Sequence, residues 1–329
     1  MSEIKRMLQA RNWMKSNENF LTTWHAHVGY KLNLFEHFTE SKTVQEVAEK
    51  YDLDETLLER WIEVGLEVGH LKKKISGKIK SKKKMVKYAS ANSDESVGIL
   101  LREMMELHIP TLLEYPNLIE SKKRITYLED KFADVVAETS TLLEKAAVTP
   151  ILKRIKQNNP ASIIDLGCGY GGYLKSIQSN FPDIQLQGVE LNKDVARMAS
   201  SRLGDQVDVY EGDLIDYIEK FSGKVDMVMA HNLLYYFPKE DRENLFKNIA
   251  GVLNKKGTVT FITPVMGATH GQTFATAFNS FMTAHENLYP LPTMNELKQD
   301  GKAAGFKVTS TKPLIREGSW YLVTLKKVK

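Results

Sequence analysis

The pattern of apolar and polar residues changes character near Pro160. Before that point, apolar residues recur at broadly helical intervals from Trp13 to Phe38, with a break expected near Gly29. Further helices are expected over 95–109 and 129–157, joined by a looser stretch that contains Pro110 and Pro116. The first 150 residues are therefore predicted to be mainly helical.

Local signals place two short helices and a hairpin within this region. Thr43-Val-Gln-Glu46 is a capping-box pattern that begins a helix through Glu49. Asp54 is a suitable N-cap for a helix over Glu55 to Val68, which Gly69 would end. Ser76-Gly77 can turn a hairpin within 71–88, and the hairpin's apolar positions are Ile75, Ile79, Met85 and Val86. Two helices followed by a basic hairpin form the winged-helix pattern.

After Pro160, segments of strand and helix character alternate. Such alternation predicts a mostly parallel sheet covered on both faces. The last two strands leave no room for a helix between them, so they must pair antiparallel. The expected strands are 161–167, 184–191, 206–212, 224–230, 257–263, 306–312 and 319–326, and the expected helices are 171–180, 193–203 and 239–253. We expect three parts: a helical domain over 1–90, a helical linker and active-site roof over 91–157, and an α/β domain over 158–329.

Composition narrows the classes of protein to consider. The net charge is +4 over 329 residues, which is well below that of a dedicated nucleic-acid binder. Cys168 is the single cysteine, so no internal disulfide is possible, and a reducing compartment is favoured. The N-terminus has no apolar stretch typical of a signal peptide, and no run approaches the roughly 18 apolar residues that span a bilayer. We therefore expect a cytoplasmic protein with no membrane partner.

The most informative motif is a glycine turn directly after the strand at 161–167. Gly167-x-Gly169-x-x-Gly172 permits positive φ and a close approach of ligand to backbone. The turn opens a helix at the carboxyl edge of the sheet, where doubly wound sheets bind ligands. Dinucleotide enzymes share this spacing, but Asp165 would repel their pyrophosphate. That carboxylate instead suits a ligand with an ammonium group, such as S-adenosylmethionine (SAM).

Two further acids follow the next two strands. Glu190 lies 23 residues after Gly167 and can accept hydrogen bonds from both ribose hydroxyls. Asp213 follows the third strand, where a short acid can reach an adenine amino group. The alternative for each acid is simple capping of the next helix, but all three together favour a nucleoside ligand.

With these residues, 161–329 resembles the class I SAM-dependent methyltransferases. The resemblance implies a Rossmann-like seven-stranded sheet and SAM as cofactor. It places the methionine portion at Asp165, Gly167 and Gly169, the ribose at Glu190 and the adenine at Asp213. The neighbouring cofactor candidates are Cys168, Leu191, Leu214, His231 and Asn232, of which the last two lie beside the transferring methyl group.

The N-terminal half, from Leu34-Phe35 to Gly69, resembles the winged-helix dimerisation domain of small-molecule O-methyltransferases. That resemblance implies a homodimer and a small-molecule acceptor, methylated at oxygen, nitrogen or carbon. Methyl transfer from a sulfonium depends largely on alignment, and a base is needed only for a protonated nucleophile. The base of that family, a His-Asp pair, falls by spacing on Tyr235-Tyr236 and is therefore absent.

Three residues are candidates for the missing catalytic role. His231 ends a strand on the ligand side, and His270 lies in the segment where the substrate pocket is expected. Tyr235 could bind the substrate, although plain packing is slightly favoured. The aromatic segment from Phe274 to Met282 could line an apolar pocket or simply fill the core.

No metal site is predicted. His25 and His27 are two apart and do not share a helix face, and His285-Glu286 has no third ligand at suitable spacing. Cys168 is expected to fill the tight turn without a redox role.

A lysine-rich segment leaves two alternatives open. Residues 72–87 contain nine lysines and no acid. One alternative is an RNA or protein methyltransferase that uses Lys72 to Lys87 as a basic wing. Another is a winged-helix regulator that senses SAM. A solvated hairpin is favoured over nucleic-acid binding because no aromatic residue interleaves the lysines before Tyr88.

Overall fold

The structure is a computed structural model that describes residues 3–127 and 129–328; within the latter, the side chains of 129–134 and 137 are not described. It divides into two units, Met1–Pro110 and Thr111–Lys329, which we describe separately. No helix in the described part of the chain is long and apolar enough to cross a membrane.

The first unit is mainly helical, as predicted. The capping box begins α3, Asp54 caps α4, and Gly69 has a φ of 72° after α4 ends. The first helix continues two residues past Gly29. The elements of this unit are α1 (Glu3–Lys31), α2 (Leu34–His37), α3 (Val44–Tyr51), α4 (Glu55–Glu67), β1 (Leu71–Lys73), β2 (Ile79–Ser81), α5 (Lys83–Ala89), α6 (Gly98–Glu103), the π-helix η1 (Met104–His108) and α7 (Ile109–Leu113), which crosses the unit boundary.

The basic hairpin is shorter than predicted. Its strands β1 and β2 pair antiparallel over only three residues each, from Leu71↔Ser81 to Lys73↔Ile79. The expected second arm instead becomes helix α5, which buries Met85 and Ala89 one turn apart. Ile75, expected among the apolar positions, is fully exposed at the turn. Helical spacing of apolar residues therefore prevailed over the hairpin pattern after Ser81.

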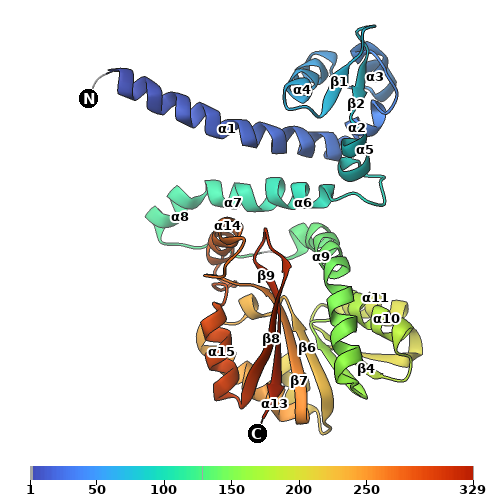
Figure 1. Cartoon of the computed structure of the whole chain (residues 1–329), viewed down its shortest axis with the longest axis vertical. Helices are drawn as coiled ribbons and strands as arrows, with labels where there is room; N and C mark the ends of the chain where they lie inside the picture. The colour runs from blue at the N-terminus through green and yellow to red at the C-terminus, as the bar shows by residue number, and fades with distance from the viewer. Residues whose placement is uncertain (1–2, 128, 329) are drawn as a thin grey trace. The chain divides into compact units, whose positions relative to one another are not determined.

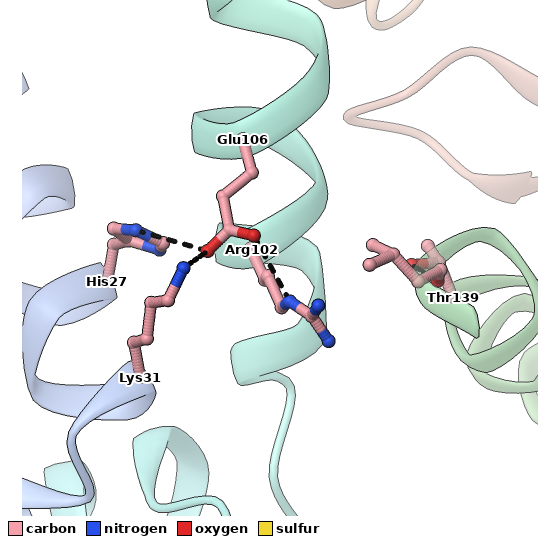
Figure 2. A network of polar contacts seen from close by, with 6 residues as sticks. His27, Lys31, Arg102, Glu106 and Thr139 are labelled. Atoms are coloured by element: carbon pink, nitrogen blue, oxygen red, sulfur yellow. Dashed lines mark hydrogen bonds and ion pairs between the residues drawn. The ribbon is translucent and has the colours of Figure 1, made fainter. Parts of the chain in front are cut away.

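A buried cluster holds the first unit together. Phe35 and Phe38 are fully buried, and Trp61 stacks on His25 with ring centroids 4.2 Å apart. Figure 2 shows a second connection, in which Glu106 of η1 accepts a hydrogen bond from Lys31 of α1 at 2.6 Å. Arg102 of α6 donates to the same carboxylate at 3.3 Å. These bonds join the first helix to the end of the unit.

The segment with Pro110 and Pro116 is helical rather than loose. Pro110 lies in α7, and Pro116 is near the start of α8 (Tyr115–Ser121), where a missing N–H costs little. After this segment comes the long helix α9 (Glu129–Asn158).

The second unit contains a seven-stranded sheet with the order β5-β4-β3-β6-β7-β9-β8. The first five strands in this order, β5, β4, β3, β6 and β7, run parallel. Strand β9 pairs antiparallel with both β7 and β8. This confirms the predicted fold class, including the final antiparallel hairpin. The strands are β3 (Ser162–Leu166), β4 (Gln185–Glu190), β5 (Val207–Glu211), β6 (Val225–His231), β7 (Leu253–Pro264), β8 (Phe306–Ile315) and β9 (Trp320–Lys327).

Helices cover both faces of this sheet (Figure 1). Alternating side chains of β3 separate two cores: Ile163 packs with α9, α10 and α11, whereas Ile164 packs with α12, α13 and α15. The remaining elements are α10 (Gly172–Asn180), α11 (Lys193–Leu203), η2 (Gly204–Gln206), α12 (Leu214–Lys220), η3 (Leu234–Tyr236), α13 (Lys239–Val252), α14 (Gln272–Thr283) and α15 (Met294–Ala303). Helices α12 and α15 were absent from the sequence prediction.

Candidate functional site

The glycine turn joins β3 to α10 and is fixed by the neighbouring strand. The N–H groups of Gly167 and Cys168 both donate to the carbonyl of Val189, at 2.8 and 3.0 Å. Gly167 has a φ of 70°, and a Cβ there would lie 2.7 Å from Leu233. Glycine is therefore required by backbone conformation and by packing.

Gly169 leaves open space beside the same turn. Its φ is 53°, and no described atom lies within 4 Å of the position that a Cβ would occupy. Glu190, at the end of β4, accepts a hydrogen bond from the N–H of Gly169 at 3.0 Å through Oε2. Its Oε1 accepts from the N–H of Asn192 at 2.9 Å. The structure thus brings this predicted pair of turn and acid together.

Asp165 is buried beneath the turn, with 1% of its surface exposed. Its Oδ2 has no hydrogen-bond partner among the described residues. Burial raises the pKa of this carboxyl well above its usual range, and the nearby Glu144 and Glu190 carboxylates raise it further. An unpaired buried carboxylate oxygen is costly, so the site calls for a cationic or hydrogen-donating partner.

Glu144 is a residue that the sequence reasoning missed. It extends from α9 to the start of α10, where its carboxylate occupies the space that a Cβ on Gly172 would need. Burial raises its pKa, while Arg202 and Lys145 oppose that shift. No spacing from the glycine motif marks Glu144, because it reaches the site only through the packing of α9.

Asp213 lies at the start of α12, beyond the end of β5. Its Oδ1 accepts hydrogen bonds from the N–H groups of Ile215 and Asp216, at 2.7 and 3.2 Å. The capping role considered for this acid is therefore present. The N–H of Gly212 donates to the carbonyl of Glu190 at 2.9 Å, which ties Asp213 to the end of β4. Of the adjacent apolar candidates, Leu191 is exposed and Leu214 is half-buried.

The end of β6 contributes His231 and Asn232. The ring Nε2 of His231 is 3.0 Å from Oγ1 of Thr260, and burial lowers the pKa of His231 to about 3. The imidazole is therefore neutral at physiological pH and a weak base. Asn232 has a φ of 55°, and its Oδ1 accepts a hydrogen bond from the indole N–H of Trp320 at 3.1 Å.

An aromatic cluster lies next to Asn232. The Trp320 ring is 5.8 Å from that of Phe274 and 5.5 Å from that of Phe278, centroid to centroid. Tyr235, the third catalytic candidate, is buried with its ring edge-on to Phe278 at 6.2 Å. His270 is exposed in the loop between β7 and α14, so the structure does not bring it into this cluster.

The remaining candidates have structural surroundings. Burial raises the pKa of the Cys168 thiol, so the side chain is a protonated filler of the turn. His25 contacts His70, with 3.0 Å between the two Nδ1 atoms, and His27 lies 3.7 Å from Glu106. Among residues 3–127 and 129–328, no group of three or more His, Cys, Asp or Glu could hold a metal ion.

The residues of the turn fit the methionine and ribose ends of SAM. Asp165 offers an unpaired buried oxygen, Gly169 leaves room for a ligand against the backbone, and Glu190 stands at the adjacent strand end. A nucleoside with an ammonium group matches this set in charge and position.

Comparisons with known proteins agree with this geometry. Residues 163–257 match a family model described as a methyltransferase domain. An uncharacterized protein of Rickettsia prowazekii (strain Madrid E), RP028, is 27% identical over 106 residues, 31% of this chain and 42% of that protein. The match therefore spans less than half of the length of that relative.

Solved structures resemble nearly the whole chain. An O-methyltransferase family protein from Burkholderia thailandensis has a TM-score of 0.79 at 18% identity, covering 99% of this chain and 98% of that one. Human N-acetylserotonin methyltransferase in complex with SAM has a TM-score of 0.76 at 14% identity, covering 100% and 99%. The mitomycin 7-O-methyltransferase MmcR has a TM-score of 0.77 at 14% identity, covering 99% and 100%. At these identities the likeness establishes the fold. Together with the match over residues 163–257, it shows a methyltransferase domain within a fold that resembles that of two-domain O-methyltransferases.

Proposed function

We propose that this methyltransferase acts on a small acceptor molecule with an apolar, aromatic part. The observation that carries the assignment of SAM to this turn is the buried, unpaired Oδ2 of Asp165 beside the open backbone of Gly169. When bound, SAM supplies an activated methyl group for in-line attack by the acceptor. The protein's contribution is then alignment, exclusion of water and, for a protonated acceptor, removal of a proton.

In this proposal the acidic residues contact different parts of the cofactor. Asp165 and Glu144 face the ammonium group. Burial raises the pKa of both carboxyls, and Arg202 and Lys145 only partly offset that shift at the half-buried Glu144. Glu190 holds the ribose, in exchange for or in addition to its bonds to Gly169 and Asn192. Asp213 contacts the adenine amino group with the oxygen not used in capping.

The aromatic cluster supports the acceptor's chemistry. The half-buried rings of Trp320 and Phe274 pack with the buried ring of Phe278, and Trp320 bonds to Asn232 beyond the carboxyl end of β6. Such surfaces favour flat apolar molecules over charged polymers. Two proteins of similar fold, an N-acetylserotonin methyltransferase and a mitomycin 7-O-methyltransferase, are named for small-molecule acceptors.

Three residues are candidates for removing a proton from the methyl acceptor, where that step is needed. His231 is neutral and bonded to Thr260, so we assign it to positioning in preference to proton removal. Tyr235 can hydrogen-bond an acceptor, and exposed His270 would have to approach by loop movement.

We also propose that the chain is a homodimer. Large apolar side chains along the first 20 residues of α1 are exposed in the single chain, including Trp13 at 77% and Met14 at 73%. We also predict a cytoplasmic location, because a chain with a single cysteine has no internal disulfide and suits a reducing compartment.

Calorimetric titration tests the cofactor assignment. Wild type should bind SAM and S-adenosylhomocysteine, and Glu190→Ala should weaken SAM binding by about tenfold or more, because a charged group's hydrogen bonds contribute roughly 1.5–3 kcal/mol. Glu219→Ala, at an exposed position of α12, is the matched control. Absence of SAM binding by the wild type would refute the proposed site.

Transfer of a labelled methyl group tests the acceptor. Phenols, aromatic amines and flat heterocycles should be methylated in preference to aliphatic acids, tRNA or protein. Exclusive methylation of tRNA or protein would instead support the basic-wing alternative, and SAM binding without any transfer would favour a SAM-sensing regulator.

A further inference from the structure

A pocket lies within the first unit, formed by β2, α5 and the loop that follows. Its volume is about 360 Å³, within the range of small-ligand pockets. None of its lining residues belongs to the glycine turn or its acids. The lining includes Lys80, Lys83, Lys87, Ser81, Ser90 and Glu36.

The charge of this lining is positive and partly unbalanced. Lys87 is paired with Glu95 at 2.8 Å, but neither Lys80 nor Lys83 forms an ion pair within the described residues. The Glu36 carboxylate is already engaged, because it accepts a hydrogen bond from Asn92 at 2.8 Å and another from Asn33. The lining thus holds two ammonium groups without an ion pair, Lys80 and Lys83, against the one carboxylate of Glu36, so its net charge is positive.

The hairpin adds to the positive potential. Lys80 on β2 directly faces Lys72 on β1. Like charges at such cross-strand positions destabilise a hairpin unless something compensates them. A bound anion would provide that compensation.

Two hydroxyl groups of the lining lack partners. Ser81 and Ser90 are each only 2% exposed, and neither Oγ has a hydrogen-bond partner within the part of the chain that the structure describes. A buried hydroxyl without a partner costs free energy, so most are satisfied in native proteins. Free hydroxyl donors beside free ammonium groups are the donor set that recognises phosphate.

We propose that this pocket binds the phosphate group of a small phosphorylated molecule. Lys80 and Lys83 neutralise the anion, and Ser81 and Ser90 rotate to donate to its oxygens. A concave site of this size suits one small molecule. A nucleic-acid backbone would also engage the exposed lysines outside the pocket, such as Lys73 and Lys74 at the hairpin turn. The proposal does not depend on methyl transfer.

The test is a calorimetric titration of the full chain with inorganic phosphate at constant ionic strength. Wild type should show saturable binding of one phosphate per chain. Lys80→Gln/Lys83→Gln should weaken that binding at least tenfold. Lys73→Gln/Lys74→Gln removes the same charge outside the pocket and should bind like the wild type. No binding, or equal weakening in the two double variants, would overturn the proposal.

A second variant separates a ligand site from a structural one. Ser81→Ala removes a hydroxyl that has no partner, so its melting temperature should equal or exceed that of the wild type. Its phosphate affinity should nevertheless fall several-fold. A single-stranded RNA of about 20 nucleotides serves as the competing ligand. If phosphate does not displace bound RNA, and both lysine double variants weaken RNA binding equally, the binding site is a diffuse basic surface and not the pocket.

Discussion

At the scale of single residues, Glu144 separates cofactor binding from folding. Its pKa is raised chiefly by burial, so folding disfavours the charged form relative to an exposed glutamate. Glu144→Gln should therefore leave the melting temperature unchanged or higher. In contrast, SAM affinity should fall by about tenfold, because a charge-assisted bond to the ammonium group is lost.

The control for this prediction is Glu138→Gln, an exposed position on the same helix. It should alter neither quantity. Because protonation of Glu144 begins at a higher pH than for an ordinary glutamate, wild-type SAM affinity should decline in mildly acidic solution before that of Glu144→Gln. Equal SAM affinity of wild type and Glu144→Gln at pH 7 would remove Glu144 from the site.

The same residue marks how far the site could be predicted from sequence. Asp165 and Glu190 follow directly from their positions at strand ends, since parallel strands bring their carboxyl ends to one edge of the sheet. Glu144 comes from a helix that precedes the sheet, and its place depends on how Ile151 and Ile155 pack against β3. Such packing produces no characteristic spacing of residues in the sequence.

At the scale of elements, strong local signals predicted boundaries well and mixed signals did not. Thr43 and Asp54 cap α3 and α4 as expected because each cap is complete within a few residues. After Ser81, however, the lysines fit either a strand or a helix. Burial of Met85 and Ala89 against the first unit's core selects the helix, and this depends on contacts distant in sequence.

The buried pair of histidines between α1 and the start of β1 predicts a pH dependence. Burial lowers the pKa of His25 to about 3, and that of His70 to about 4. Since both values lie below the 6.5 of an unfolded chain, the unfolded state binds more protons between these limits. The stability that neutral histidines confer is thus present above pH 6.5 and is lost as the pH falls toward 4.

Thermal unfolding followed by tryptophan fluorescence checks this dependence. Between pH 6.5 and 4.5, the first unit should lose on the order of 5 kcal/mol of stability, because each of the two buried histidines contributes about 1.4 kcal/mol per pH unit. His70→Asn should lose less on acidification, whereas His270→Asn, at an exposed position, should behave like the wild type. A melting temperature that is constant over this range would contradict the assignment.

At the scale of the whole molecule, the topology of the second unit was predictable because its rules are strict. Alternating strands and helices, followed by two strands with a short connection, admit few arrangements. The observed order β5-β4-β3-β6-β7-β9-β8 is one of them. Contacts that chains make with one another do not follow from such rules, and they must be inferred from exposed surface.

Helix α1 provides that surface. Met7, Met14 and Leu21 are seven residues apart and therefore share one face, and Trp13 and Phe20 lie beside it. All five are exposed in the single chain. A helix that extends without packing is marginally stable in water, so this face calls for a partner. A second copy of the chain can supply a self-complementary surface of roughly 800 Å² from each protomer.

Light scattering after size exclusion should accordingly give a mass near twice the 37.4 kDa of one chain. Trp13→Glu/Phe20→Glu should shift the protein to monomer because two charges would be buried in the apolar contact. Lys5→Glu/Lys15→Glu changes charge on the same helix without altering the apolar face, and should remain dimeric. A monomeric wild type at micromolar concentration would contradict the inference. A dimer unaffected by Trp13→Glu/Phe20→Glu would place the interface elsewhere, because an apolar contact on α1 could not accommodate the buried, unpaired carboxylates.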